Sequence, residues 1–273
     1  MSLFKSALVA GIIGFTGVAS ATVIETDRLQ NLLNDITVEN VGDPTSSLSS
    51  IDVNEDQQKF DEVWALTATG GSVSTLVIQL SEVSANFDSF GVYDVADPEN
   101  YVEIFDANGV AAATEEDGLS STFSIKASGK TYLNNVAYTN DGGEEVYFER
   151  NRFGYYLTQN GVTYYSEAAL NSVAAPAPGG EAPGGLVGEI EDHMVAYAGE
   201  GDLVELPGNW PGEWTANEYI LAWEDELLSA SDRDYDDFVV MVESVESVSE
   251  PALIFGLGLG LAAFGFAVRR KRA

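Results

Sequence analysis

The chain has 273 residues and is strongly acidic, with 44 aspartate and glutamate residues against 12 lysine and arginine residues and a formal net charge of -32. Such a surface repels nucleic acid, so we expect no nucleic-acid partner. Hydrophobic residues make up 45% of the chain, which is enough for a folded core. The absence of cysteine excludes disulfides, thiolate metal sites and cysteine nucleophiles.

The first 21 residues have the pattern of a secretory signal peptide. Lys5 supplies a short positive start, residues 7–18 form an apolar stretch, and Ala19 and Ala21 are the small residues of a cleavage site. We therefore expect export through the Sec machinery and cleavage after Ala21. The alternative is a buried N-terminal helix that remains in the mature protein.

Residues 22–58 are predicted to form an N-terminal extension with one short helix. Within residues 25–36 the apolar residues follow the i, i+3, i+4, i+7 spacing of one helix face: Leu29, Leu32, Leu33 and Ile36. Residues 42–53, which are rich in serine and include a Gly-Asp-Pro sequence, have the composition of a loop.

Residues 59–248 are predicted to form one all-β domain, a β-sandwich or a jelly roll. Short apolar segments alternate with turn residues such as Asn160-Gly161, as is typical of antiparallel folds. The proline- and glycine-rich segment 174–185 is predicted to be a surface loop inside this domain, the alternative being a linker between two domains. The predicted strands cover residues 63–69, 72–80, 87–95, 101–107, 119–127, 144–150, 152–158, 162–170, 192–199 and 219–225.

Several residues of the C-terminal half allow more than one interpretation. His193, the single histidine, could be a catalytic base or a metal ligand, but we expect a structural side chain hydrogen-bonded near the acidic loop. No G-x-S-x-G element accompanies it, and chance pairs of carboxylates are expected among 44 acids, so we do not predict an enzyme. Four aromatic residues either stack on sugar rings or complete the core: Trp210, Trp214, Tyr219 and Trp223.

The segment 232–240, DRDYDDFVV, places four carboxylates within six residues and then becomes apolar. In a turn these side chains can converge on a cation, and Ca²⁺ accepts about six to eight oxygen ligands in irregular loops. We predict a calcium loop at the start of a strand, with these ligands: Asp232, Asp234, Asp236, Asp237, Glu224 and Asp225. It is not an EF-hand, because Asp237 replaces the required glycine. The alternative is a solvated acidic turn.

The C-terminus combines an apolar stretch at 252–268, long enough to span a bilayer as a helix, with a basic end: Arg269, Arg270, Lys271 and Arg272. Val248, Glu250 and Pro251 come just before the stretch. This tripartite tail, residues 249–273, resembles the PEP-CTERM sorting signal, although Ser249 stands where the first proline is usual. The resemblance implies a Gram-negative bacterium that makes exopolysaccharide, and an exosortase that removes the helix. An ordinary permanent anchor would look similar.

A second resemblance covers roughly residues 60–245. The sequences Asp192-His193-Met194, Trp223-Glu224-Asp225 and residues 232–239 are similar to the D-H-M, W-E-D and D-x-D-Y-[ND]-D motifs of a domain of unknown function found in PEP-CTERM proteins. That family implies a β-rich fold and calcium sites, but no activity. Asp236 stands where the family often has asparagine, which keeps an oxygen ligand.

Together these patterns predict an exported, calcium-stabilised protein of the cell surface or extracellular matrix. It would be anchored transiently in the inner membrane, sorted by exosortase and associated with exopolysaccharide or biofilm. Two alternatives remain open at this point: a carbohydrate-binding or carbohydrate-active protein of the same matrix, and a surface protein that stays anchored in the membrane.

Overall fold

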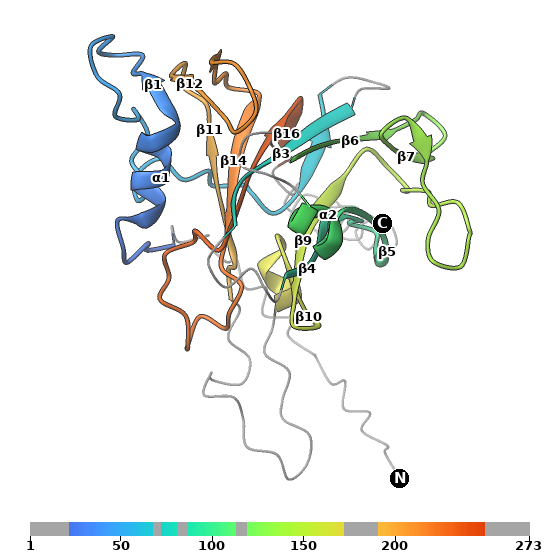
Figure 1. Ribbon diagram of the computed structural model, residues 1–273. Helices are drawn as coiled ribbons and strands as arrows, with labels where there is room; N and C mark the ends of the chain where they lie inside the picture. Colours follow the sequence, from blue (N-terminus) through green and yellow to red (C-terminus); the bar gives the residue numbers. More distant parts are fainter. Residues whose placement is uncertain (1–21, 68–71, 81–86, 113–118, 172–190, 249–273) are drawn as a thin grey trace, which may run out of the picture.

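The computed structural model describes residues 22–67, 72–80, 87–112, 119–171 and 191–248. These residues form antiparallel sheets with little helix, which confirms the all-β class predicted from the sequence (Figure 1). The predicted signal peptide, the loop 174–185 and the sorting tail lie outside the described residues. Within the described ranges, no helix has the length and apolar character needed to cross a membrane.

The first sheet has six strands and carries most of the central aromatic residues of the molecule. Its neighbouring strands are antiparallel throughout, and β9 and β10 form a hairpin closed by Asn160 and Gly161, both at positive φ. In spatial order the strands are β16 Val245–Ser247, β2 Trp64–Leu66, β9 Phe153–Gln159, β4 Phe87–Asp94 and β5 Asp97–Asp106, with β10 Val162–Tyr165 paired to β9.

The second sheet has seven strands and is also antiparallel. Its order joins segments far apart in the sequence, because β3 pairs with β15 on one side and with β6 on the other. The strands in order are β11 Met194–Ala198, β14 Glu218–Trp223, β15 Phe238–Glu243, β3 Ser72–Leu80, β6 Leu119–Ile125, β7 Thr131–Leu133 and β8 Val136–Ala137.

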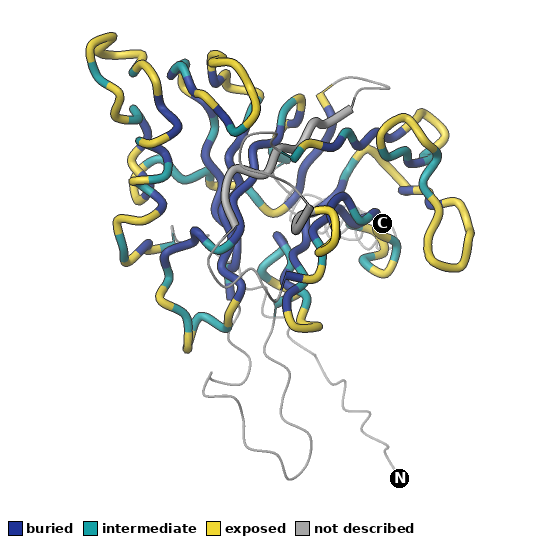
Figure 2. Tube along the Cα trace, viewed as in Figure 1, coloured by how far each residue is buried: buried dark blue, intermediate teal, exposed yellow. Residues whose placement is uncertain are grey.

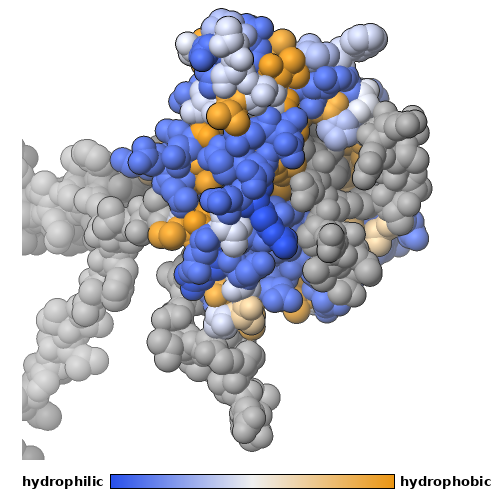
Figure 3. Space-filling model, turned by 60° about the vertical axis from the view of Figure 1, so that its left-hand side comes forward, coloured by the Kyte–Doolittle hydropathy of each residue, from blue (hydrophilic) through white to orange (hydrophobic). Residues whose placement is uncertain are grey.

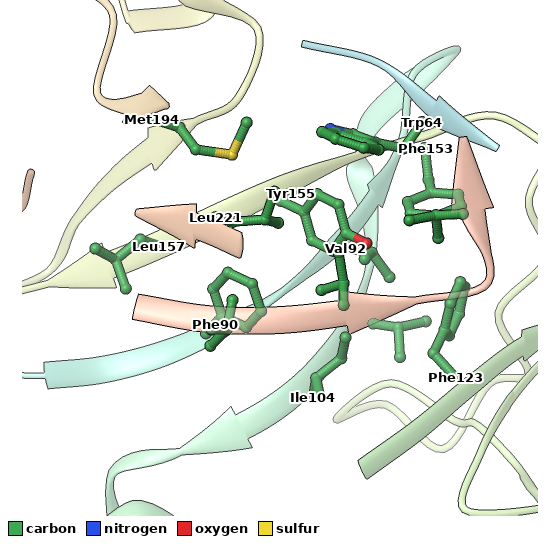
Figure 4. Packing of buried hydrophobic residues seen from close by; sticks show 14 of the residues in the cluster. Trp64, Phe90, Val92, Ile104, Phe123, Phe153, Tyr155, Leu157, Met194 and Leu221 are labelled. Carbon is green, nitrogen blue, oxygen red and sulfur yellow. The ribbon is translucent and has the colours of Figure 1, made fainter. Parts of the chain in front are cut away.

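The main core lies between these two sheets, whose inward side chains point toward one another (Figure 4). Phe90 of β4 contacts Phe238 of β15 with ring centroids 4.8 Å apart, and Trp64 of β2 contacts Tyr219 of β14 at the same distance. Each such aromatic pair contributes about 0.5–1.5 kcal/mol beyond the area that it buries. Burial is accordingly concentrated in the strands and falls off in the outer loops (Figure 2).

A second core covers the other face of the second sheet at strands β11, β14 and β15. Strand β14 alternates between the two cores, with Leu221 and Trp223 in the first and Ile220 and Ala222 in the second. Helix α1, Arg28–Ile36, supplies the covering layer through Leu29, Leu33 and Ile36, as its spacing predicted. A strand buried on both faces reads as a continuous apolar run, which explains the sequence YILAW.

The N-terminal residues therefore form part of the packed molecule. After α1 the chain enters a three-stranded sheet formed by β1 Thr37–Glu39, β12 Leu203–Val204 and β13 Gly212–Glu213. The side of the molecule that carries α1 presents a largely hydrophilic surface with small scattered apolar patches (Figure 3). The remaining helical elements are short: α2 Ala107–Ala112 and the 3-10 helix η2 Ala168–Asn171.

Two strand predictions need correction. Residues 144–150 form no strand; after a turn at 140–143 they make only isolated bridges, Thr139 with Glu145 and Lys130 with Tyr147. Residues 162–170 contain a strand only as far as Tyr165, after which Ser166 donates its backbone N–H to the Tyr155 carbonyl and the chain turns into η2.

Candidate metal centre

The candidate centre lies where strand β14 ends and strand β15 begins. Trp223 and Phe238 are opposite each other in the ladder, so the next residue on each strand, Glu224 and Asp237, lies at the same end of the sheet. The Asp225 backbone N–H donates to Asp237 Oδ2 at 3.1 Å and fixes the start of the connection. The intervening loop then brings Asp234 back to this end.

Glu224, Asp234 and Asp237 form a carboxylate triad whose oxygens lie within 4.8 Å of one another. Glu224 and Asp234 are each only 1% exposed. Glu224 Oε2 is buried and accepts no hydrogen bond, whereas the buried Asp234 Oδ2 forms an ion pair with Arg28 but no hydrogen bond. A buried carboxylate oxygen without a partner is costly, because a buried charge needs a counter-charge or hydrogen-bond donors.

The loop that carries Asp234 has an unusual backbone. Arg233 and Tyr235 both have positive φ, at 53° and 55°, a region that non-glycine residues seldom adopt. Across Tyr235, the Asp236 N–H donates to Asp234 Oδ1 at 3.3 Å. Tyr235 turns inward, is fully buried, and donates its hydroxyl to the Asp192 carbonyl at 2.6 Å. The strained loop is thus held by packing of its central tyrosine.

Helix α1 supplies a cation to one side of the cluster. Arg28 Nη1 lies 3.3 Å from Asp234 Oδ2 and 3.6 Å from Asp236 Oδ1. The Arg28 side chain is 63% exposed, so these ion pairs are screened by solvent. Arg28 approaches the loop from the side of Asp234 and Asp236, whereas Glu224 and Asp237 belong to the strand ends.

Burial and crowding raise the pKa values of the cluster. The pKa of Glu224 is raised to about 9, first by burial and then by Asp237 and Asp234. The pKa of Asp225 is raised to about 7 by burial and Asp237, and that of Asp234 to about 6 by burial and Asp236. Without a further cation, the fully ionised cluster is therefore unfavourable in the folded protein.

His193 borders the cluster but is committed to structural contacts. It is 1% exposed, its Nδ1 lies 3.0 Å from the Glu224 carbonyl, and its Nε2 lies 3.1 Å from Glu191 Oε2. The ring also packs on Tyr164 with centroids 4.2 Å apart. Burial lowers the pKa of His193, against the opposing effect of its hydrogen bonds. The arrangement agrees with the structural role expected from the sequence.

The six predicted calcium ligands do not all take equivalent positions. Glu224, Asp234 and Asp237 form the triad, and Asp225 and Asp236 are buried beside it. Asp232 is exposed and outside the triad; its charge acts on Arg28 instead. Spacing by two suggested convergence of Asp232, Asp234 and Asp236, but the left-handed residues of the loop direct only the last two inward.

Three of the four aromatic residues considered for sugar stacking are buried. Trp214, Tyr219 and Trp223 are buried, and they belong to two different cores on opposite faces of the second sheet. Trp210 alone is exposed, at 92%. The other interpretation of this group, that the aromatics complete the core, fits these three residues.

Two contributors to the centre were missed in the sequence. Arg28 is 206 positions from Asp234 and reaches it only because α1 packs on the second sheet. Glu191 immediately precedes the D-H-M sequence, but its partnership with His193 follows from the loop ahead of β11. The available signal for Arg28 was that it is the single basic residue in the sequence of α1.

The donor set of the centre consists of carboxylate oxygens. Hard divalent cations such as Ca²⁺ and Mg²⁺ prefer oxygen ligands, whereas structural zinc sites favour nitrogen and sulfur. The buried Glu224 Oε2 that lacks a partner is the ligand atom such an ion would satisfy. The residues present therefore fit a hard cation.

No family model, curated protein or solved structure matches this chain. Of the predicted processing residues, Val248 is described, and its N–H donates to the Val63 carbonyl at 2.7 Å. Ala19, Ala21, Glu250 and Pro251 lie outside the described residues.

Proposed function

We propose that this protein is an exported, calcium-stabilised β-sandwich of the cell surface or extracellular matrix. The observation that carries the proposal is the carboxylate triad, and above all Glu224 Oε2, a buried carboxyl oxygen that accepts no hydrogen bond. Ca²⁺ would neutralise the triad, lower the raised pKa values of its members and tie the strand ends β14 and β15 to the loop between them.

Calcium suits this centre and this location better than other hard cations. An irregular loop can satisfy Ca²⁺, whereas Mg²⁺ demands near-octahedral geometry and gives up water reluctantly. Extracellular calcium modules work with dissociation constants of roughly 10⁻⁴–10⁻³ M, which a site of a few carboxylates can reach. Stabilisation by an ion that binds this weakly supports a location outside the cell.

The route to the surface is inferred from the two ends of the chain. Thr22, the first residue after the predicted cleavage site, is already anchored: its N–H donates to Gln57 Oε1 and its hydroxyl to Asp192 Oδ2. At the other end, Val248 pairs with Val63 just before the PEP-CTERM-like motif. The tail would anchor the folded body transiently in the inner membrane, and exosortase would then act on this tail.

The proposed role is structural or adhesive, in association with exopolysaccharide or biofilm, rather than catalytic. His193 supports this role because both of its ring nitrogens already have partners within the protein. A surface protein that keeps its membrane helix is the alternative for the tail.

Thermal unfolding of the mature body tests the calcium centre. Saturation at about 100 times the dissociation constant should stabilise the protein by roughly 2.7 kcal/mol relative to EDTA. Mg²⁺ should stabilise it less. Glu224→Gln keeps the side-chain shape and removes one charge, so it should fold well in EDTA but lose most of the calcium gain.

The matched control is Asp232→Asn, in the same loop but exposed and outside the triad. It should keep the calcium gain. Sodium chloride at equal ionic strength separates specific binding from screening. If calcium stabilises the protein no more than this salt does, the cluster is only a solvated acidic loop and the proposal fails.

Mass spectrometry of protein isolated from the cell surface tests the route. We expect an N-terminus at Thr22 and a C-terminus near Pro251. Recovery of intact C-terminal RRKRA peptides from most of the surface protein would instead favour the permanent anchor.

A further inference from the structure

The outer face of the first sheet carries an unusual set of side chains. Strand alternation directs Phe90, Val102 and Leu157 into the core, so their neighbours face outward. These neighbours are not a uniformly charged solvent face. They combine tyrosines, hydroxyl side chains and two acids: Tyr93, Tyr101, Tyr156, Tyr165, Ser89, Thr158, Thr163, Glu99 and Glu103.

Two glycines let the tyrosine rings lie close against this face. A Cβ on Gly91 would come within 2.8 Å of the Tyr156 ring and 2.2 Å of the Val102 carbonyl oxygen, and a Cβ on Gly154 within 2.2 Å of the Tyr93 ring. The rings of Tyr156 and Tyr93 therefore lie directly over the glycine backbone, in the space that a side chain would fill at another residue. Tyr101 stands edge-on to Tyr156, with centroids 5.7 Å apart at 79°, and is itself 45% exposed.

Together with Pro98, these side chains except Tyr93 line a groove of about 470 Å³ that runs across β5, β4, β9 and β10. Its aromatic part includes Tyr101, Tyr156 and Tyr165, and its polar part includes Ser89, Thr163 and Glu103. Its size lies within the range of small-molecule sites, roughly 300–1,000 Å³. None of the lining residues belongs to the carboxylate triad.

The chemistry of the lining selects among possible ligands. Glu99 and Glu103, on a chain of net charge -32, disfavour an anionic ligand. A simple cation would be bound by acceptor atoms alone. The serine, threonine and tyrosine hydroxyls of the groove can donate hydrogen bonds as well as accept them. Aromatic surface beside groups that donate and accept matches a molecule with an apolar face and a hydroxyl-rich edge. A pyranose ring has this combination.

We propose that this groove binds a neutral polysaccharide chain, with Tyr101 as the exposed stacking surface and Glu103 and the neighbouring hydroxyls as hydrogen-bonding partners. The site is distinct from the proposed sugar stacking of the tryptophans, and it goes beyond the calcium-stabilised function without depending on it. Burial, with help from Asp106 and Asp141, raises the pKa of Glu103, so this carboxyl is held in a shielded position suited to a ligand hydroxyl.

Calorimetric titration of the mature body tests the proposal with three neutral probes: cellohexaose, maltohexaose and mannohexaose. At least one should bind, and a tetragalacturonate, which is anionic, should not. Tyr101→Ala should weaken the binding about tenfold. The matched control is Tyr147→Ala, because Tyr147 is also 45% exposed but does not line the groove, and it should leave binding unchanged.

Three results would overturn the proposal. The first is that none of the three neutral probes binds. The second is that a cationic chitosan hexamer binds in preference to them. The third is that Trp210→Ala loses binding whereas Tyr101→Ala does not. The last would place the sugar site at the exposed tryptophan. Titrations of Glu224→Gln in calcium and in EDTA keep the two proposals separate, since loss of the calcium gain should leave the groove affinity unchanged while the protein stays folded.

Discussion

At the residue scale, the buried polar groups around β11 and β14 explain why a single histidine is placed beside so many acids. His193 Nδ1–H donates to the Glu224 carbonyl on one side, and Nε2 pairs with Glu191 Oε2 on the other. Glu191 Oε2 also accepts the Leu228 N–H at 3.3 Å, so the pair connects the start of β11 to the loop after β14. The histidine thus holds in place the backbone from which Glu224 projects.

His193→Ala should lower the free energy of unfolding by about 2–4 kcal/mol, because it removes two hydrogen bonds, leaves Glu191 less well paired and opens a cavity beside Tyr164. Glu191→Gln keeps an oxygen and should cost less. Urea unfolding measures both values. A folded His193→Ala variant of unchanged stability that had lost a hydrolytic activity of the native protein would contradict the structural role.

At the scale of elements, the ends of β14 and β15 concentrate carboxylates whose pKa values are raised: Glu224 to about 9, Asp225 to about 7 and Asp234 to about 6. Asp192, ahead of β11, is raised to about 6 by burial. The folded protein therefore holds protons that the unfolded chain has already released. This is the region where a cation or a proton matters most to the fold.

In EDTA, stability should fall as pH rises from about 5 to about 8, because the folded state binds more protons than the unfolded state across that window. The stability is fully present below the unfolded pKa values and is lost as pH passes the folded ones. The lowered pKa of His193 acts in the opposite direction, but only below its usual value near 6.5. Chemical unfolding at a series of pH values measures the slope.

Calcium should reverse this trend, since it competes with protons for the same oxygens. The calcium gain should thus be larger at pH 8 than at pH 5, and binding should release protons into a weakly buffered solution. A stability in EDTA that rises steadily between these pH values would show that the carboxylates are not the controlling groups.

At the scale of the whole molecule, strands β11, β14 and β15 of the second sheet are covered on both faces. The first sheet covers one face, and α1 with residues 51 and 53 covers the other. The residues 22–58, expected from the sequence to be an extension, therefore bury part of the sheet that carries the metal centre. They also provide Arg28, which pairs with Asp234 and Asp236.

A chain of residues 59–248 should for this reason be far less stable than one of residues 22–248. Removing the N-terminal layer exposes a continuous apolar face that includes Tyr197, Ile220 and Met241, and such a face promotes association. We expect a loss of roughly 5 kcal/mol or more, comparable to the whole stability of a small domain. Size-exclusion chromatography and dye binding report it, and a monomeric, cooperatively unfolding 59–248 chain would contradict the expectation.

Local patterns in the sequence were sufficient for the class of fold, helix α1 and most strands. The spacing of Leu29, Leu33 and Ile36 predicted both α1 and its buried face, and short apolar runs between turns predicted antiparallel strands. The same reasoning failed at residues 144–150, whose composition favours a strand but which form only isolated bridges. Composition indicates that a strand is possible there, but the pairing depends on a partner elsewhere in the chain.

The sequence by itself determined that an acidic loop enters an apolar strand, because charge and hydropathy are properties of neighbouring residues. Only the tertiary structure decided which acids meet. Glu224 and Asp237 lie together because Trp223 pairs with Phe238, and Asp234 joins them because left-handed residues turn the loop inward. The structure likewise decided which aromatics are exposed. An apolar or aromatic residue can face either side of a strand, and the side is chosen by what packs there.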